Sequence, residues 1–319
     1  MRCACLVAVL VLAAGLAQAQ SYPAKPVRII APFPAGGGTD IVARILARRL
    51  AEDFSQSFVV DNRTGAAGII GCEAVARSAP DGYTLLMGTT GTHTTNPAVF
   101  AKLPYDPVKD FAPVALAASS PFVLVVHPSV PAKTLRELLA LAKARPDSLT
   151  YSSSGVGGIA HLGFVLLNNM AGTRMVHIPY KGSPLQTQAA VAGEVAIAFD
   201  SIPVTQPFIK AGRVRALGIG STKRSALLPE VPTVTEAGLP GYELASWYAI
   251  FAPANTPAEI VRTLNRAIVK GVDSAALREQ FAPLGAEPAG GAPDDLAAVV
   301  QKDLRKWAKV ARDGGVKPE

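Results

Sequence analysis

The stretch Pro32-Phe33-Pro34-Ala35-Gly36-Gly37-Gly38-Thr39-Asp40 decides how the rest of the chain is interpreted. The apolar run 27–31 before it predicts a buried strand, and the apolar spacing from Ile41 to Leu50 predicts one face of a helix. Three consecutive glycines allow the backbone to approach a ligand closely. The free N–H groups at the start of that helix favour an anion. The stretch therefore predicts a cradle for a carboxylate or phosphate, with an ordinary strand-to-helix turn as the alternative.

Residues 1–19 have the pattern of a secretory signal peptide. Arg2 precedes an apolar run that is too short to span a membrane, and Ala17-Gln18-Ala19 forms a small-x-small cleavage site. We therefore expect cleavage near Ala19/Gln20 and function in the periplasm. Of the three cysteines only Cys72 would remain, so no internal disulfide is expected.

The composition indicates a globular protein. Hydrophobic residues make up 49% and charged residues 17% of the 319 residues, a length that favours two domains over one. The formal charge of +7 would attract small anions by weak steering. Lys and Arg are scattered, without a basic run interleaved with aromatic residues, so nucleic-acid binding is not expected.

A strand, a loop of small polar residues and a helix recur along the chain. Loop 88–97 is dense in hydroxyl groups, which offer donors to a carboxylate without a fixed charge; a polar surface loop is the alternative. In open parallel α/β sheets, ligands bind beyond the carboxyl ends of the strands. The recurrence thus predicts an α/β protein with two mainly parallel sheets, each flanked by helices, facing one another across a cleft that closes by hinge motion. The loops follow predicted strands that end at Ile30, Met87, Ser152, Ile178 and Phe199.

The chain is predicted to cross between the two domains twice. Residues 111–118 and 122–126 are expected to form two apolar strands, with the first crossing at residues 125–129. The aromatic strand 246–252 is the expected return crossing. We assign residues 20–126 and 249–319 to domain 1 and residues 127–248 to domain 2.

Gly155, Gly157 and Ala160 match the dinucleotide-binding pattern G-x-G-x-x-A between a predicted strand and a helix. The next strand, however, ends in Pro179-Tyr180-Lys181 and offers no carboxylate for a ribose. We therefore interpret this loop as a second anion cradle and expect no cofactor.

Several motifs, taken jointly and in order, resemble the tripartite tricarboxylate transporter substrate-binding receptors, also called the Bug family of periplasmic binding proteins. The resemblance implies a two-domain type II periplasmic-binding-protein fold. It also implies a monomeric receptor for a small organic carboxylate, held by backbone amides and waters and delivered to a permease of one large and one small subunit. The motifs are the stretch 32–40, Asp81-Gly82-Tyr83-Thr84, Leu103-Pro104-Tyr105-Asp106-Pro107, His161-Leu162, and Pro179-Tyr180-Lys181-Gly182.

The resemblance also carries a set of ligand-binding positions, with no catalytic residue and no metal ligand. Among the histidines, His93 is the best candidate for touching the ligand, and His161 is expected to support a loop. Asp200 is expected to contact the ligand or its waters, or alternatively to cap a helix. The positions are Phe33, Ala35, Gly36, Gly37, Gly38, Thr39, Thr89, Gly91, Thr92, His93, Ser153, Ser154, Gly155, Tyr180, Lys181, Gly182 and Asp200.

The chain departs from the family pattern at Ala35, and at Val156, Gly158 and Ile159, where more polar residues are expected. If Ile159 lines the cleft, a monocarboxylate or an aromatic carboxylate is favoured over citrate.

Two alternatives to a transport receptor remain open at this level. A secreted α/β hydrolase or isomerase acting on carboxylates would use His93 or His161 with Asp200, although no G-x-S-x-G, P-loop or H-E-x-x-H motif occurs. A receptor that serves a sensor protein is the other alternative.

Overall fold

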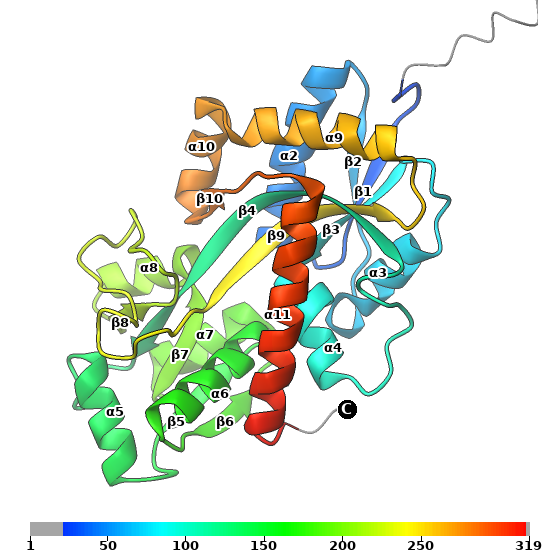
Figure 1. Ribbon diagram of the computed structural model, residues 1–319. Helices are drawn as coiled ribbons and strands as arrows, with labels where there is room; N and C mark the ends of the chain where they lie inside the picture. The colour runs from blue at the N-terminus through cyan, green and yellow to red at the C-terminus, as the bar shows by residue number, and fades with distance from the viewer. Residues whose placement is uncertain (1–21, 317–319) are drawn as a thin grey trace, which may run out of the picture.

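The computed structural model describes residues 22–316 (Figure 1). The predicted signal peptide and its cleavage site lie outside these residues. The described chain is an α/β structure, as predicted, in which ten strands form one continuous sheet. None of the helices within residues 22–316 combines the length and apolar character needed to span a bilayer.

The first lobe contains the sheet order β2-β1-β3-β9-β4. Its first three strands are parallel, because a helix or helical turn connects each to the next, whereas β9 runs antiparallel to both β3 and β4. The strands are β1 (Val27–Ala31), β2 (Phe58–Asn62), β3 (Thr84–Thr89), β4 (Phe111–Val126), β9 (Ala245–Pro253) and β10 (Glu287–Pro288), which pairs with β4.

The second lobe begins at the end of β4, which pairs there with β7 and β8. β5 lies parallel to both β6 and β7. The strands are β5 (Thr150–Ser153), β6 (Val176–Pro179), β7 (Ile197–Ser201) and β8 (Arg215–Ile219).

β4 passes from one lobe to the other as a single strand of 16 residues, where the sequence predicts two strands. Pro121 is the last residue of β4 that is paired with β9, and Phe122 is the first that is paired with β7. Proline has no N–H for a sheet ladder, so it is tolerated where the pairing changes. The change of partner therefore lies before the crossing predicted at residues 125–129.

Helices cover the sheet in both lobes. The first lobe carries α2 (Gly38–Phe54), α3 (Ile69–Ala76), α4 (Asn96–Val99), α9 (Ala258–Val272) and α10 (Ala275–Phe281), with short turns η1 (Ala66–Gly68), η2 (Gly91–Thr95) and η3 (Ala282–Leu284). The second carries α5 (Leu135–Ala144), α6 (Ile159–Ala171), α7 (Ser183–Ala192) and α8 (Ile202–Lys210).

The last helix, α11 (Pro293–Asp313), runs alongside both lobes (Figure 1). Its first half buries Leu296 and Val300 in an apolar cluster of the first lobe. Its second half buries Trp307 and Val310 in the main core of the second lobe. Burial of apolar surface at both ends makes α11, with β4 and β9, a third link between the lobes.

Candidate functional site

A cavity of about 350 Å³ lies between the two lobes, at the carboxyl ends of β1, β3 and β5. We refer to it as the cleft. The strand ends of the two lobes face one another there, which is the position expected for a ligand in this class of fold. Its lining residues are Phe33, Thr39, Ala67, Thr89, Gly91, Thr95, Asn96, Ser154, Gly155, Val156, Gly158, Ile159, Ser246 and Tyr248.

The loop between β1 and α2 forms one wall of the cleft, and Asp40 holds its shape. The Asp40 carboxylate accepts hydrogen bonds from the Gly36 N–H at 2.9 Å, from Arg44 Nε at 3.0 Å and from Asn62 Nδ2 at 3.0 Å. Asn62 also donates to the Phe33 carbonyl at 3.0 Å. Burial disfavours the charge on Asp40, but these donors outweigh it and hold the pKa of that carboxyl below its ordinary value.

Gly38 is the position where this loop needs a residue without a side chain. A Cβ placed there would lie 2.6 Å from the hydroxyl oxygen of Tyr248, which lines the cleft from β9. The glycine run therefore allows an aromatic side chain to pack directly against the start of α2. Of the predicted positions in this loop, Phe33 and Thr39 line the cleft, while Ala35, Gly36, Gly37 and Gly38 are exposed on the loop beside it.

The loop after β3 closes into the single π-helical turn η2. Thr92 Oγ1 accepts from the Thr89 N–H at 2.9 Å, so the turn folds back on the end of its own strand. Thr89 and Gly91 line the cleft as predicted residues of the loop, whereas Thr92 is fully buried beneath it. Thr95 and Asn96 also line the cleft.

His93 lies beneath the cleft and does not line it. Its ring is fully buried and stacks on Phe251 with 3.9 Å between the centroids. Nδ1 lies 2.9 Å from Thr92 Oγ1, and Nε2 has no hydrogen-bond partner among the described residues. Burial lowers the pKa of His93 to about 3. The π-turn directs this neutral ring inward, where it supports the loop. The ligand contact predicted for His93 stays a prediction.

The loop between β5 and α6 forms the opposite wall. Ser154 and Gly155 line the cleft, but the Ser153 side chain turns away from it. Ser153 Oγ donates to the Gly155 carbonyl at 2.8 Å and lies 2.6 Å from His177 Nε2. Ser153 therefore shapes the loop from below.

Two stacked histidines support the same loop. His161 Nδ1 accepts from the Gly157 N–H at 3.0 Å, and its ring lies on that of His177 with 3.9 Å between the centroids. Burial lowers the pKa of His161 to about 4, and burial together with the neighbouring His161 lowers that of His177 to about 3. The supporting role predicted for His161 agrees with this geometry.

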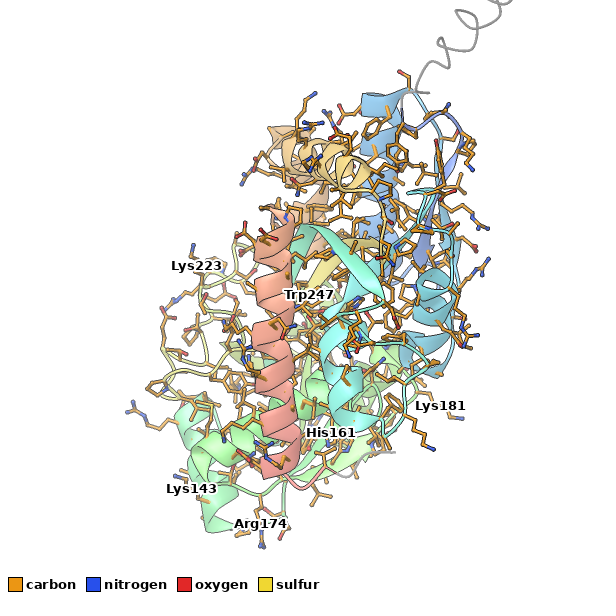
Figure 2. The ribbon with its side chains drawn as sticks, turned by 45° about the vertical axis from the view of Figure 1, so that its right-hand side comes forward. Lys143, His161, Arg174, Lys181, Lys223 and Trp247 are labelled. Carbon is orange, nitrogen blue, oxygen red and sulfur yellow. The ribbon has the colours of Figure 1, made fainter. Side chains whose placement is uncertain are left out.

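The loop after β6 does not line the cleft. Tyr180 donates from its hydroxyl to Glu194 at 3.4 Å, and Gly182 caps the start of α7. Lys181 is exposed, and Figure 2 shows it at the outer edge of the molecule, pointing away from the body.

Asp200 is buried at the start of α7, and it also lies outside the lining of the cleft. Its carboxylate accepts from Ser183 Oγ at 2.7 Å, Gln186 Nε2 at 2.7 Å and Thr187 Oγ1 at 2.6 Å. Burial raises the pKa of Asp200, and these donors oppose that shift. The carboxylate thus lies beside the positive end of α7 as an internal anion, but its partners are side chains and it does not cap the backbone of that helix.

The predicted positions leave out eight of the lining residues: Val156, Gly158, Ile159, Ala67, Thr95, Asn96, Ser246 and Tyr248. The last two come from β9, where side chains alternate between the two faces of the strand. That alternation was the available signal, since it directs Ser246 and Tyr248 to one face and Trp247 to the other. Within residues 22–316 there is no group of three His, Cys, Asp or Glu side chains arranged to hold a metal ion.

Known proteins resemble this chain over nearly all of its length. The sequence model of the family described as "Tripartite tricarboxylate transporter family receptor" matches residues 42–316. BugT of Bordetella pertussis is 37% identical over 316 residues, which cover 98% of this chain and 97% of BugT.

Solved structures give the same result. An R. palustris protein with adipate has a TM-score of 0.85 and 39% identity, covering 93% of this chain and 100% of that one. The periplasmic binding protein BugD has a TM-score of 0.80 and 32% identity, with the same coverage of 93% and 100%.

Proposed function

This chain belongs to the tripartite tricarboxylate transporter receptor family, and we propose that its cleft captures a small organic carboxylate for a membrane permease. The observation that carries the proposal is the start of α6. Gly158 caps this helix without a side-chain hydrogen bond, and it lines the cleft together with Ser154 and Gly155. Free N–H groups and the helix dipole favour a carboxylate there. The similar R. palustris protein was solved with adipate, a carboxylate.

The chain acts as a receptor in the periplasm, like the similar periplasmic binding protein BugD. The signal peptide is cleaved near Ala19/Gln20, and the mature protein works as a monomer. It delivers its ligand to a permease of one large and one small subunit, and a sensor protein is the alternative partner. The buried, neutral His93 supports binding over catalysis, because a ring without access to the cleft has no proton exchange with a ligand.

Ligand capture is coupled to hinge closure between residues 20–126 with 249–319 and residues 127–248. β4, β9 and α11 link the lobes, and the cleft takes its lining residues from both. Closure brings the start of α6 towards the loop after β3 and excludes water from the carboxylate, which strengthens its hydrogen bonds. X-ray scattering profiles recorded with and without a tight ligand are expected to differ, with the smaller radius for the bound form.

Thermal unfolding against a panel of organic acids tests the proposal. A ligand that binds only the native state stabilises it by RT ln(1 + [L]/Kd), about 2.7 kcal/mol at a hundredfold excess over Kd. One class of carboxylate is expected to raise Tm, and mass spectrometry should recover it unchanged. Ser154→Asp should abolish the shift by placing a negative charge in the cleft. Ser148→Asp, at an exposed turn, is the matched control. The proposal is contradicted if no organic acid raises Tm, or if the acid recovered after binding is chemically altered.

A further inference from the structure

A second cavity lies behind β9, on the side of Trp247. We refer to it as the rear cavity. Its volume is about 350 Å³, and it takes lining residues from β4, β9 and α11, the three elements that link the lobes. Ser246 lines both the rear cavity and the cleft, so β9 forms the wall between them. A cavity of this size accommodates a small molecule.

Strand pairing builds the floor of the rear cavity. Ser119 of β4 is paired with Trp247 of β9 on one side and with Glu287 of β10 on the other. Directly paired residues point to the same face of a sheet, and all three line the cavity. α11 lies over this face, where Asp303 accepts from Trp247 Nε1 at 3.0 Å. A carboxylate of α11 is therefore held beside the floor.

The lining contains charges of both signs that are not neutralised by one another. Lys302 and Glu243 lie 3.8 Å apart and form an ion pair. The other charged side chains of the lining make no ion pair among the described residues. They are Lys223, Glu287, Asp303 and Lys306.

Asp303 and Lys306 are the partly buried members of this set. They lie three residues apart on α11, which places them on the same face of the helix. Lys306 Nζ donates to the Glu243 carbonyl at 2.8 Å and keeps its other N–H donors free. Trp247 occupies one oxygen of Asp303 and leaves the second free. Burial raises the pKa of Asp303 and lowers the pKa of Lys306, so each charge would be stabilised by a close counterion.

From these two neighbouring charges of opposite sign and the cavity that they line, we infer that the rear cavity is a second ligand site, for a zwitterion of the α-amino acid type. The ammonium group of the ligand donates to the free oxygen of Asp303, and its carboxylate accepts from Lys306 Nζ. An apolar side chain of the ligand packs on Leu116 and Val299, which line the same cavity.

A ligand with a single charge fits this site less well than a zwitterion. An anion would neutralise Lys306 but would be repelled by Asp303, and a cation would meet the reverse arrangement. The two charges of an α-amino acid are separated by one carbon atom, which suits two protein charges on adjacent turns of one helix. The site is separate from the cleft and does not depend on the proposed function.

Titration of the mature protein with leucine tests the inference. Trp247 and Trp307 are the only two tryptophans of the chain and both line the rear cavity, so intrinsic fluorescence reports its occupancy. The comparison compounds are 4-methylpentanoate, which lacks the ammonium group, and 3-methylbutylamine, which lacks the carboxylate. Leucine is expected to bind at least about tenfold more tightly than either. The inference is overturned if either compound binds as tightly as leucine, or if leucine gives neither a fluorescence change nor a heat of binding in calorimetry.

Variants of α11 test the two charges separately. Asp303→Asn removes the negative charge and keeps an acceptor for the Trp247 indole, whereas Lys306→Met removes the positive charge and keeps the aliphatic stem. Each should weaken leucine binding at least about tenfold. Asp313→Asn and Lys309→Met make the same exchanges in an exposed ion pair of α11 and are the matched controls. Equal leucine affinity in each variant and its control would contradict the inference.

The variant Ser154→Asp, which introduces a negative charge into the cleft, separates the two sites. Leucine should bind to it with unchanged affinity and give the same fluorescence change. If Ser154→Asp abolishes the leucine response, leucine occupies the cleft, and the rear site is rejected while the receptor function stands. If leucine binds to Ser154→Asp while no organic acid raises Tm of the unmodified protein, the rear site stands and the proposed function fails.

Discussion

Single residues determine which side chains the cleft exposes. Tyr248 enters the cleft because the register of β9 with β3 places it opposite Thr89. Its hydroxyl then packs against Gly38, the one position in the loop where a Cβ would touch it at 2.6 Å. The position of the Tyr248 ring therefore requires a glycine at position 38, although the two residues are far apart in the sequence.

Gly38→Ala is expected to destabilise the protein by about 1–3 kcal/mol, because the added methyl group overlaps the Tyr248 hydroxyl. It should also weaken carboxylate binding, since it displaces the start of α2. Urea denaturation and calorimetric titration measure the two effects. The double variant Gly38→Ala with Tyr248→Phe removes the overlapping oxygen and should recover most of the lost stability. If the double variant is as unstable as Gly38→Ala alone, the overlap with the Tyr248 hydroxyl is not the cause of the lost stability.

At the scale of elements, neutral histidines support two of the cleft loops from below. His93 lies under the turn after β3, and the stacked pair of His161 and His177 lies under the loop after β5. A neutral Nδ1 is required at His161, because it accepts the Gly157 N–H. Protonation would replace that acceptor with a donor and place a charge in an apolar setting. The shape of these loops therefore depends on pH.

The stability of the protein is expected to fall as the pH is lowered below about 6.5, the pKa of histidine in an unfolded chain. The folded pKa values of His93, His161 and His177 are lowered to about 3, 4 and 3. The unfolded chain therefore binds these protons first, and their contribution, complete above pH 6.5, is lost towards pH 4. Urea unfolding between pH 4 and 8 measures this pH dependence of the free energy of unfolding. The decline should be shallower in His161→Gln, and a slope unchanged by that substitution would argue against this origin.

At the scale of the whole molecule, β9 and α11 tie the lobes together on the side of β9 opposite the cleft. Trp247 Nε1 donates to Asp303 of α11 at 3.0 Å, and the Trp247 N–H donates to Thr90 Oγ1 at 2.9 Å. Ser246 and Tyr248, the neighbours of Trp247, line the cleft. One strand thus connects the bridging helix with the ligand site.

Trp247→Phe is expected to destabilise the protein by about 1–3 kcal/mol, because it leaves the partly buried Asp303 carboxylate without its indole donor. Trp307→Phe is the matched control on α11. Its Nε1 has no hydrogen-bond partner among the described residues, so that substitution changes packing without removing a hydrogen bond. Urea unfolding compares the two variants. A loss at Trp307→Phe as large as that at Trp247→Phe would assign the effect to packing alone.

The sequence by itself determined the α/β class, the strand–loop–helix units and the family, because these depend on local periodicity, glycine positions and motif order. It also located Phe33, Thr39, Thr89, Gly91, Ser154 and Gly155, which line the cleft. The limits of the two domains stay a prediction.

Only the tertiary structure decided which way the remaining side chains face. His93 turns onto Phe251, and Asp200 fills the start of α7. Tyr248 reaches the cleft through antiparallel pairing with β3, more than a hundred residues earlier in the chain. These orientations depend on burial and on strand pairing between distant segments. Residue type and local spacing do not specify which distant residues a side chain will contact.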